Sequence, residues 1–401
     1  MSKAALLPGA LTGVRVLEFS ALIAGPSAAR YLADHGAEVI KIERFPGGDA
    51  SRMTNRAGSK RSAMFIQHNG GKKSLCVDLT QAAGLEIARD LVRKSDVVIE
   101  AFTPGVMARL GLGYEHLKAL NPKIILCSIS GFGQTGPNAA RPGYAHIAHS
   151  MTGWLAMQSL YRDPPERPQG PGIAIADVIT GITAFGALCA ALFKRERTGL
   201  GEHIDLALFD ALFAANDETL QRCLIDGVAQ PAYHPVHKTQ DGYVTANIGP
   251  DFRAWQNICK ALARPDLLED PRFANLAAVN ANARAAVKLL ADWLATQTSE
   301  AADRILTEHH VAVGVLKTVE EAVRQPQVLA RGLITPVDDP VLGRIEVINS
   351  APKFSNASVQ VRGHAPKLGE HNESVLRQVL EYDNEKIAAL SASGVLKYEA
   401  I

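Results

Sequence analysis

Runs of β-branched and other apolar residues alternate, over the first half of the chain, with stretches whose apolar positions recur every three or four residues. Six runs have the length and composition of strands, and they cover residues 14–19, 38–43, 74–79, 97–102, 124–130 and 203–209. Helical patterns lie between several of them, at 27–34, 81–94 and 114–120. This alternation predicts an α/β fold with a doubly wound parallel sheet.

The pattern changes after residue 230, where prolines and histidines interrupt the alternation. Beyond that point two helical segments follow one predicted strand, and the tail returns to short strands before a last helix. These segments cover 242–248, 252–263, 282–297, 333–337, 344–348 and 373–380. We therefore expect a smaller second domain over residues 230–325.

Composition narrows the class of protein. The chain of 401 residues is 47% hydrophobic and 21% charged, which is typical of a soluble globular protein with a sizeable core. Its 42 basic and 41 acidic residues leave a net charge of +1, so we expect no nucleic-acid partner. The longest apolar run, 178–193, has 16 residues, short of the ~20 that span a bilayer. We expect no membrane partner and, without a signal-like N-terminus, a cytoplasmic location.

Cysteine and histidine spacing indicates no metal site. Five cysteines lie 34 or more residues apart, which suits buried, reduced thiols better than a metal or disulfide framework. Two histidine pairs have the spacing of neighbours on a helix, but no carboxylate or cysteine completes either set. We interpret His146, His149, His234 and His237 as ordinary polar histidines.

A glycine pattern follows the strand predicted over 124–130. Gly131, Gly133 and Gly136 form a literal G-x-G-x-x-G, which in dinucleotide-binding proteins opens a helix whose N–H groups hold the pyrophosphate. Here Pro137 and Pro142 follow too closely for a helix to begin. We expect a loop that faces substrate rather than a nucleotide fingerprint.

One carboxylate lies in an otherwise uncharged apolar stretch. Asp177 interrupts GIAIADVITGITAFGALCAALF, where an unpaired charge would cost several kcal/mol. It could serve as the N-cap of the helix that follows. It could also be a desolvated nucleophile, stabilised by the same helix N-terminus. The two roles are compatible.

Basic residues gather near predicted strand ends and turns. Arg44 precedes a PGGD turn, Lys72 and Lys73 follow Gly70 and Gly71, and Arg109 follows a Pro-Gly pair. Ligands bind to α/β sheets at such edges. Phosphate binding and scattered solvated charges explain these positions equally well.

Several segments together resemble the family III CoA-transferases, the CaiB/BaiF family of formyl-CoA transferase and carnitine CoA-transferase type. The resemblance covers residues 11–225 and about 320–380. It is carried by LTGVRVLEFSALIAGPSAARYLADHGAEVIKIERFPGGD, NGGKKSLCVDL, EAFTPGVMARLGLGYEHL, NPKIILCSISGFGQTGP, ADVITGITAFGALCAALFKRERTGLGEHIDLALFD and LGEHNESVL.

The resemblance implies a Rossmann-like large domain from residues 1–229 and 326–401, with a parallel sheet formed from both chain ends and a smaller inserted α+β domain. It further implies an interlocked homodimer. A CoA thioester would be the substrate, with no tightly bound cofactor, and the implied CoA contacts are Leu22, Ala24, Arg44, Lys72, Lys73, Phe102, Arg109, Leu110 and Tyr144.

Asp177 stands where the family's nucleophile stands, so the resemblance implies transfer of CoA to a carboxylic acid through an aspartyl anhydride and an aspartyl-CoA thioester. Succinyl-CoA and a dicarboxylate are the expected donor and acceptor. Oxalate is not expected, because Ile23 replaces the glutamine of formyl-CoA:oxalate transferases and their run of glycines is missing. An alternative is a 2-methylacyl-CoA racemase, whose catalytic histidine corresponds to Tyr144 here. A third possibility is a CoA-binding or scaffold protein without catalytic activity, in which Asp177 only caps the helix.

Overall fold

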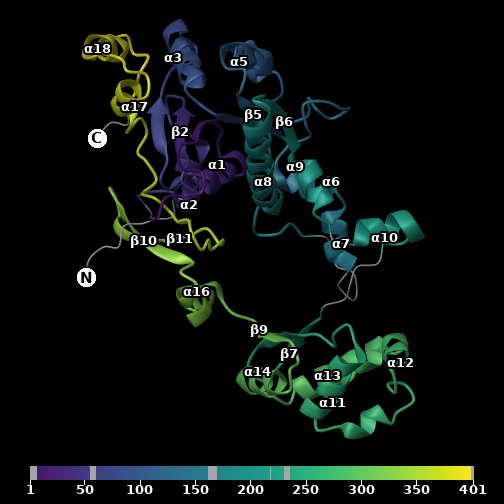
Figure 1. Ribbon diagram of the computed structural model, residues 1–401. Coiled ribbons are helices and arrows are strands. Elements are labelled where there is room, and N and C mark those ends of the chain that lie inside the picture. Colours follow the sequence, from purple (N-terminus) through teal and green to yellow (C-terminus); the bar gives the residue numbers. More distant parts are fainter. Residues whose placement is uncertain (1–6, 55–59, 161–168, 217, 230–234, 399–401) are drawn as a thin grey trace. The chain divides into compact units, whose positions relative to one another are not determined.

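The computed structural model describes residues 7–54, 60–160, 169–216, 218–229 and 235–398. The chain divides into two compact units, one of residues 1–229 with 330–401 and one of residues 230–329. Figure 1 shows both units in ribbon form. The second unit begins at the residue where the sequence pattern changes and ends four residues beyond the predicted boundary at 325.

A six-stranded parallel sheet forms the centre of the large unit. Its strands are β1 (Arg15–Phe19), β2 (Glu38–Glu43), β3 (Lys73–Cys76), β4 (Val97–Glu100), β5 (Ile125–Ser130) and β6 (Glu202–Ala207). They lie in the order β3-β2-β1-β4-β5-β6, and all neighbours are parallel. The chain therefore reverses its direction of winding between β1 and β4, and in such sheets ligands bind in the crevice at the carboxyl ends of these two strands.

Helices cover both faces of this sheet, because successive strand residues point to opposite sides. Val16 packs with α1 (Ala24–Asp34), α6 (Ala145–Met151), α8 (Ile175–Thr198) and α9 (Leu208–Ala214). Its neighbour Leu17 packs on the other face, with α3 (Ala82–Arg93), α4 (Val106–Arg109) and α5 (Tyr114–Leu120). Shorter elements of this unit are η1 (Ala50–Met53), α2 (Ala63–Asn69), α7 (Trp154–Leu160) and α10 (Thr219–Asp226).

The C-terminal part of the chain completes the large unit without adding a strand to the described parallel sheet. The helices α17 (Asn372–Gln378) and α18 (Asn384–Ala392) pack beside α3 over its second face (Figure 1). The two C-terminal strands, β10 (Ile334–Asp339) and β11 (Gly343–Ile348), pair with each other in an antiparallel sheet of their own. The expectation that both chain ends supply strands to the parallel sheet is therefore wrong. Only three residues separate β10 from β11, which permits a hairpin, whereas parallel pairing needs a long crossover.

The helix α8 is longer than its predicted apolar run. It has 24 residues, and by length and composition it is the one helix among the described residues that could cross a membrane. Core helices of soluble proteins meet the same criterion, and α8 buries Ala184 and Leu188 against the sheet and α1.

The small unit is an α+β domain with its own core. Its antiparallel sheet has the order β7-β8-β9 and comprises β7 (Val236–Lys238), β8 (Tyr243–Ala246) and β9 (Val313–Val315). Trp255 and Phe273 are fully buried at the centre. The helices are α11 (Phe252–Ala261), η2 (Pro265–Leu268), α12 (Leu276–Ala281), α13 (Ala283–Leu294), α14 (Ser299–Glu308) and α15 (Val319–Ala322); α16 (Pro326–Ala330) follows at the boundary between the units.

Candidate active site

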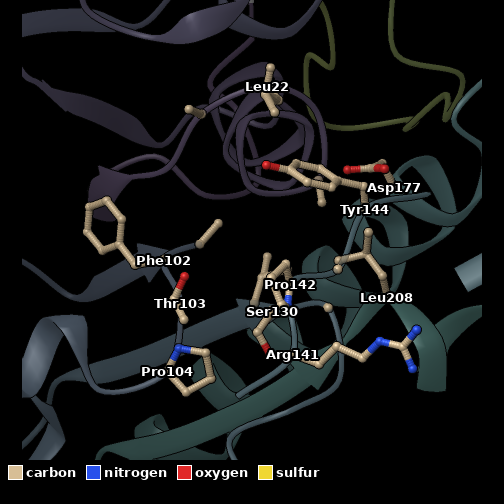
Figure 2. Close-up of a pocket in the computed structure, with 16 residues that line it drawn as sticks. Leu22, Phe102, Thr103, Pro104, Ser130, Arg141, Pro142, Tyr144, Asp177 and Leu208 are labelled. Atoms are coloured by element: carbon tan, nitrogen blue, oxygen red, sulfur yellow. The ribbon is translucent and has the colours of Figure 1, made fainter. Parts of the chain in front are cut away.

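A pocket opens at the carboxyl ends of β1, β4 and β5 in the large unit, at the point where the winding reverses. Loop residues after these strands line it, together with residues at the beginnings of α1, α6, α8 and α9 (Figure 2). The lining residues are Ala21, Leu22, Ala24, Ala101, Phe102, Thr103, Pro104, Ile129, Ser130, Gly131, Arg141, Pro142, Gly143, Tyr144, Asp177 and Leu208. The pocket therefore lies where a doubly wound sheet binds its ligand.

Asp177 is the only carboxylate among the described residues that line this pocket. It lies in the first turn of α8, whose N-cap is Ala174, so the expectation that Asp177 itself caps the helix is wrong. The N–H groups of Asp177 itself and of Ala24, the first residue of α1, act on this carboxylate and lower its pKa. The N-termini of two helices thus meet at one carboxylate, an arrangement that favours negative charge.

The ionisation of Asp177 reflects two opposing effects. Burial raises its pKa to about 6, and the two backbone N–H groups and nearby His146 lower it only in part. The group is consequently ionised at neutral pH but more basic than an exposed aspartate. A desolvated, ionised carboxylate held at one oxygen is suited to nucleophilic attack on a carbonyl carbon.

A buried histidine holds the beginning of α8. His149 of α6 is 2% exposed, and its Nε2 accepts the N–H of Ala176 at 3.1 Å. Burial and the neighbouring His146 lower the pKa of His149, which favours the neutral ring that this hydrogen bond requires. His149, expected to be an ordinary polar histidine, is thus a backbone partner of the residue before Asp177.

The glycine pattern after β5 forms a loop, as expected, and no helix begins between residues 131 and 144. Gly131 and Gly143 approach so closely that a Cβ at Gly131 would lie 2.6 Å from the Cα of Gly143. This contact folds the loop back on itself and brings Arg141 and Pro142 to the pocket. Arg141 is exposed, and no pattern in the sequence marks it, because it lies in a loop without a regular period.

The structure brings four of the predicted CoA contacts to the pocket, namely Leu22, Ala24, Phe102 and Tyr144. Three others lie outside its lining. Leu110 packs against the core of the second face of the sheet. Arg44, directly after β2, and Arg109, at the end of α4, are exposed.

The two predicted lysine contacts are not available to a ligand in this structure. Lys72 is 2% exposed, and its ammonium donates to Glu18, to the carbonyl of Pro26 and to Asn69 at 2.6–3.0 Å. Lys73 is the first residue of β3 and lies at the amino edge of the sheet, opposite the pocket, where it pairs with Glu38 at 2.6 Å.

No group of three or more histidine, cysteine or acidic residues that could hold a metal ion occurs among the described residues. His234 lies outside them. The five cysteines are free; Cys223, on α10, is exposed and Cys189, on α8, is partly exposed, so the expectation that all are buried is wrong for these two. Since Cys76, Cys127 and Cys259 are buried, desolvation raises the pKa of each thiol and makes it unreactive.

The fold and the pocket define an α/β protein with one desolvated carboxylate at the switch point of a parallel sheet. The sequence pattern that defines CoA-transferase family III matches residues 11–372, and the chain belongs to that family. It is accordingly a CoA-transferase whose substrates include a CoA thioester.

Individual relatives agree with this assignment. The chain is 33% identical over 397 residues to a succinyl-CoA:glutarate CoA-transferase from Mus musculus. The matched region covers 96% of this chain and 90% of that protein. It is 33% identical over 403 residues to a succinyl-CoA–D-citramalate CoA-transferase from Chloroflexus aurantiacus, covering 97% and 98%. A crystal structure of a CaiB/BaiF family protein from Brucella suis superposes with a TM-score of 0.80 at 33% identity, covering 93% of this chain and all of that one.

Proposed function

We propose that the protein transfers CoA from succinyl-CoA to a dicarboxylate, with Asp177 as the covalent nucleophile. The observation that carries this proposal is the position of Asp177, a partly buried carboxylate on the pocket wall whose pKa burial raises to about 6. Relatives that act on glutarate and citramalate support both the donor and the class of acceptor.

The reaction begins when a free oxygen of Asp177 attacks the thioester carbonyl and CoA leaves as a thiolate. The product is a mixed anhydride between Asp177 and the succinyl group. The thiolate then attacks the aspartyl carbonyl, which releases succinate and leaves an aspartyl-CoA thioester. An acceptor carboxylate repeats these steps in reverse: it displaces the thiolate to form a second anhydride, and the thiolate attacks the acceptor's acyl carbon. Asp177 is regenerated, and the free energy of the thioester bond is conserved in the new acyl-CoA.

The pocket supplies what these intermediates require. Backbone N–H groups near the carboxylate, of which Ala24 provides one, are suited to stabilise oxyanion character at the aspartyl oxygen. Water must be excluded because it would hydrolyse the anhydride. The apolar side chains of Leu22, Phe102 and Leu208 line the pocket around the nucleophile and support this exclusion.

For CoA itself, we propose that Leu22, Ala24, Phe102 and Tyr144 contact the pantetheine arm. Arg44, Arg109 and Leu110 complete the proposed set, with the two exposed guanidinium groups as partners of the phosphates. Arg141 joins them as a pocket residue with an exposed cation. It is a candidate for the distal carboxylate of a dicarboxylate substrate, which a guanidinium binds through paired hydrogen bonds.

The decisive experiment is trapping of the acyl enzyme. Incubation with succinyl-CoA and hydroxylamine, followed by peptide mass spectrometry, should yield a hydroxamate at Asp177. Asp177→Ala should lose both the hydroxamate and the exchange of radiolabelled CoA. Asp210→Ala is a matched control, since Asp210 also lies in the first turn of a helix and burial raises its pKa too, but it does not line the pocket.

The racemase alternative predicts a different result. Tyr144 stands in the pocket where racemases carry a histidine, and a phenol is a much weaker base at neutral pH. Deuterium incorporation at the α-carbon of a 2-methylacyl-CoA, without CoA exchange and without a hydroxamate, would establish racemisation and reject transfer.

We further propose that the protein is a homodimer. The helix α8 exposes the apolar side chains of Ile182 and Phe193, 53% and 66% accessible, and Leu200 follows at 61%. A second copy of the chain is an occupant that would remove such side chains from water. Light scattering after size-exclusion chromatography should give twice the 42.9 kDa of one chain.

A further inference from the structure

Four charged side chains lie buried together between the sheet and α1. Glu18, Lys41, Asp49 and Lys72 are each at most 2% exposed, and their charges sum to zero. Lys41 Nζ lies 2.6 Å from Glu18 Oε1 and 2.9 Å from Asp49 Oδ2. Desolvation offsets much of the attraction within buried ion pairs, so stability alone is a weak reason for such a cluster. Its place beneath the loop from β1 to α1 suggests a positional role.

Two of these groups hold that loop by its backbone. Lys41 Nζ donates to the carbonyl of Ser20 at 2.8 Å, and Asp49 Oδ1 accepts the N–H of Leu22 at 3.0 Å. The same oxygen accepts the N–H and the hydroxyl of Ser51, both at 2.8 Å, which fixes the carboxylate in turn. One buried ion pair thus fixes the loop at two backbone atoms, one on either side of Ala21.

The held loop has an unusual conformation. Leu22 has φ +70°, a left-handed value that residues other than glycine seldom adopt and that persists where surrounding contacts impose it. Two residues later, Ala24 lines the same pocket as Asp177, and its N–H lowers the pKa of that carboxyl. Gly25 then packs so tightly on Ser20 that a Cβ there would lie 2.4 Å from the Ser20 side chain. The direction of the Ala24 N–H therefore depends on the turn at Leu22.

We propose that Asp49, paired with Lys41, is a positioning residue for the reaction of Asp177, because it holds the turn at Leu22 that directs the Ala24 N–H to the nucleophile. The inference rests on the proposed function of Asp177. Because Leu22, Ala24 and Asp177 line one pocket, a change in this turn displaces the Ala24 N–H relative to the carboxylate that attacks the thioester carbonyl. Small displacements of a reacting group lower rates strongly, so a residue that touches no substrate can still control the reaction.

The variant Asp49→Asn tests this role, because it keeps the size of the side chain and removes the charge that pairs with Lys41. The first measurement is the pH dependence of carbodiimide labelling at Asp177, followed by peptide mass spectrometry. Displacement of the Ala24 N–H, which lowers the pKa of Asp177, should move the labelling midpoint upward by about 0.5–1 pH unit. The rate of CoA exchange should fall about tenfold or more, while KM for succinyl-CoA stays within about threefold.

Asp34→Asn is the matched control. Asp34 is a 1% exposed carboxylate at the other end of α1, where it pairs with Arg30 at 2.7 Å. This variant should lower the melting temperature and leave the labelling midpoint of Asp177 unchanged. A purely structural role for Asp49 predicts that both variants behave alike, and that result would overturn the proposal.

Asp49→Ser provides a second variant if Asp49→Asn does not fold. The hydroxyl of the introduced serine can still accept the N–H of Ser51, but the serine side chain is too short to reach the N–H of Leu22. The same upward shift of the labelling midpoint of Asp177 is therefore expected. A folded Asp49 variant with the wild-type midpoint and rate contradicts the inference. Labelling needs no acyl transfer; a shifted midpoint in a protein that forms no hydroxamate would reject the proposed function and retain the positioning role.

Discussion

Gly181 of α8 lies against Ser27 of α1 so closely that a Cβ added to Gly181 would be 2.1 Å from the hydroxyl oxygen of Ser27. That hydroxyl is not free to move, since it donates to the carbonyls of Ile23 and Ala24 at 2.7 and 3.0 Å. The contact is one helical turn from Asp177. The close approach of the two helices at this glycine therefore brings the N-terminus of α1 to Asp177.

We expect Gly181→Ala to force α8 away from α1. Overpacking of this kind costs about 1–3 kcal/mol and should lower the melting temperature by several degrees. CoA exchange should fall about tenfold or more, because Asp177 moves away from the Ala24 N–H. Ser27→Ala in the same chain removes the overlapping oxygen and should restore part of both losses.

A second glycine of α8 serves as the control for this prediction. A Cβ at Gly186 would meet no atom within 4 Å, so Gly186→Ala should keep wild-type exchange and melt at the same temperature or higher. Equal melting temperatures for Gly181→Ala and Gly186→Ala would contradict the predicted overlap.

The pKa of Asp177 predicts the acid limit of the reaction. Because burial raises this pKa to about 6, the nucleophile is protonated below that pH. The rate of CoA exchange under kcat/KM conditions should therefore fall about tenfold for each pH unit below 6 and level off above 7. If the rate instead falls only near pH 4, the range in which an exposed aspartate titrates, the carboxylate is solvated in the working enzyme.

The same shift predicts how stability depends on pH. The pKa of Asp177 is higher in the folded chain than in the unfolded chain, so the folded protein binds more protons between pH 4 and 6. Stability contributed by the protonated form is complete below the unfolded pKa and is lost as pH rises through 6. Asp177→Asn should consequently raise the melting temperature at pH 7.5, by an amount corresponding to about 1–3 kcal/mol, and have little effect at pH 4. Thermal unfolding of both proteins across this range is the measurement.

Local patterns in the sequence predicted the six parallel strands and singled out Asp177, which lies in the pocket, because both produce signals within a few residues. Strand periodicity marks β1 to β6, and a lone charge in an apolar stretch marks Asp177. The pairing of strands has no comparable signal. The sequence predicts strands at 333–337 and 344–348, but only the short turn between them indicates that they pair with each other as a hairpin.

The contacts that position Asp177 lie outside the reach of local patterns. Asp49 bonds to Leu22, 27 positions away in sequence, and His149 bonds to Ala176 at the same separation. Asp49 ends the PGGD turn and His149 belongs to a histidine pair, but neither pattern indicates its distant partner. Lys72 and Lys73 are adjacent in sequence and indistinguishable there, but Lys72, just before β3, donates to the carbonyl of Pro26 in α1, whereas Lys73, the first residue of β3, lies at the amino edge of the sheet.

Arg44 and Arg109 are predicted to bind the phosphates of CoA. Alanine at either position should raise KM for succinyl-CoA about tenfold and leave kcat nearly unchanged, because binding to a remote phosphate is the same in the ground and transition states. Succinyl-pantetheine, which lacks these phosphates, is the control substrate. Its KM should be the same in the variants and the wild type, and an equal increase for both substrates would place the arginines near the thioester instead.

Replacing Lys72 should lower the free energy of unfolding far more than replacing Lys73. Neither replacement should change the KM for succinyl-CoA. Lys72→Met removes one partner of a fully buried pair and leaves Glu18 with only Lys41, at a cost of about 3–5 kcal/mol. Lys73→Met breaks a partly exposed pair with Glu38 and should cost less than about 1 kcal/mol. Denaturant unfolding measures both values. Below their melting temperatures both variants should retain the wild-type KM for succinyl-CoA, because neither ammonium is placed to reach a phosphate at the carboxyl edge of the sheet. A raised KM in Lys72→Met, with unfolding like that of Lys73→Met, would mean that Lys72 leaves Glu18 when CoA binds.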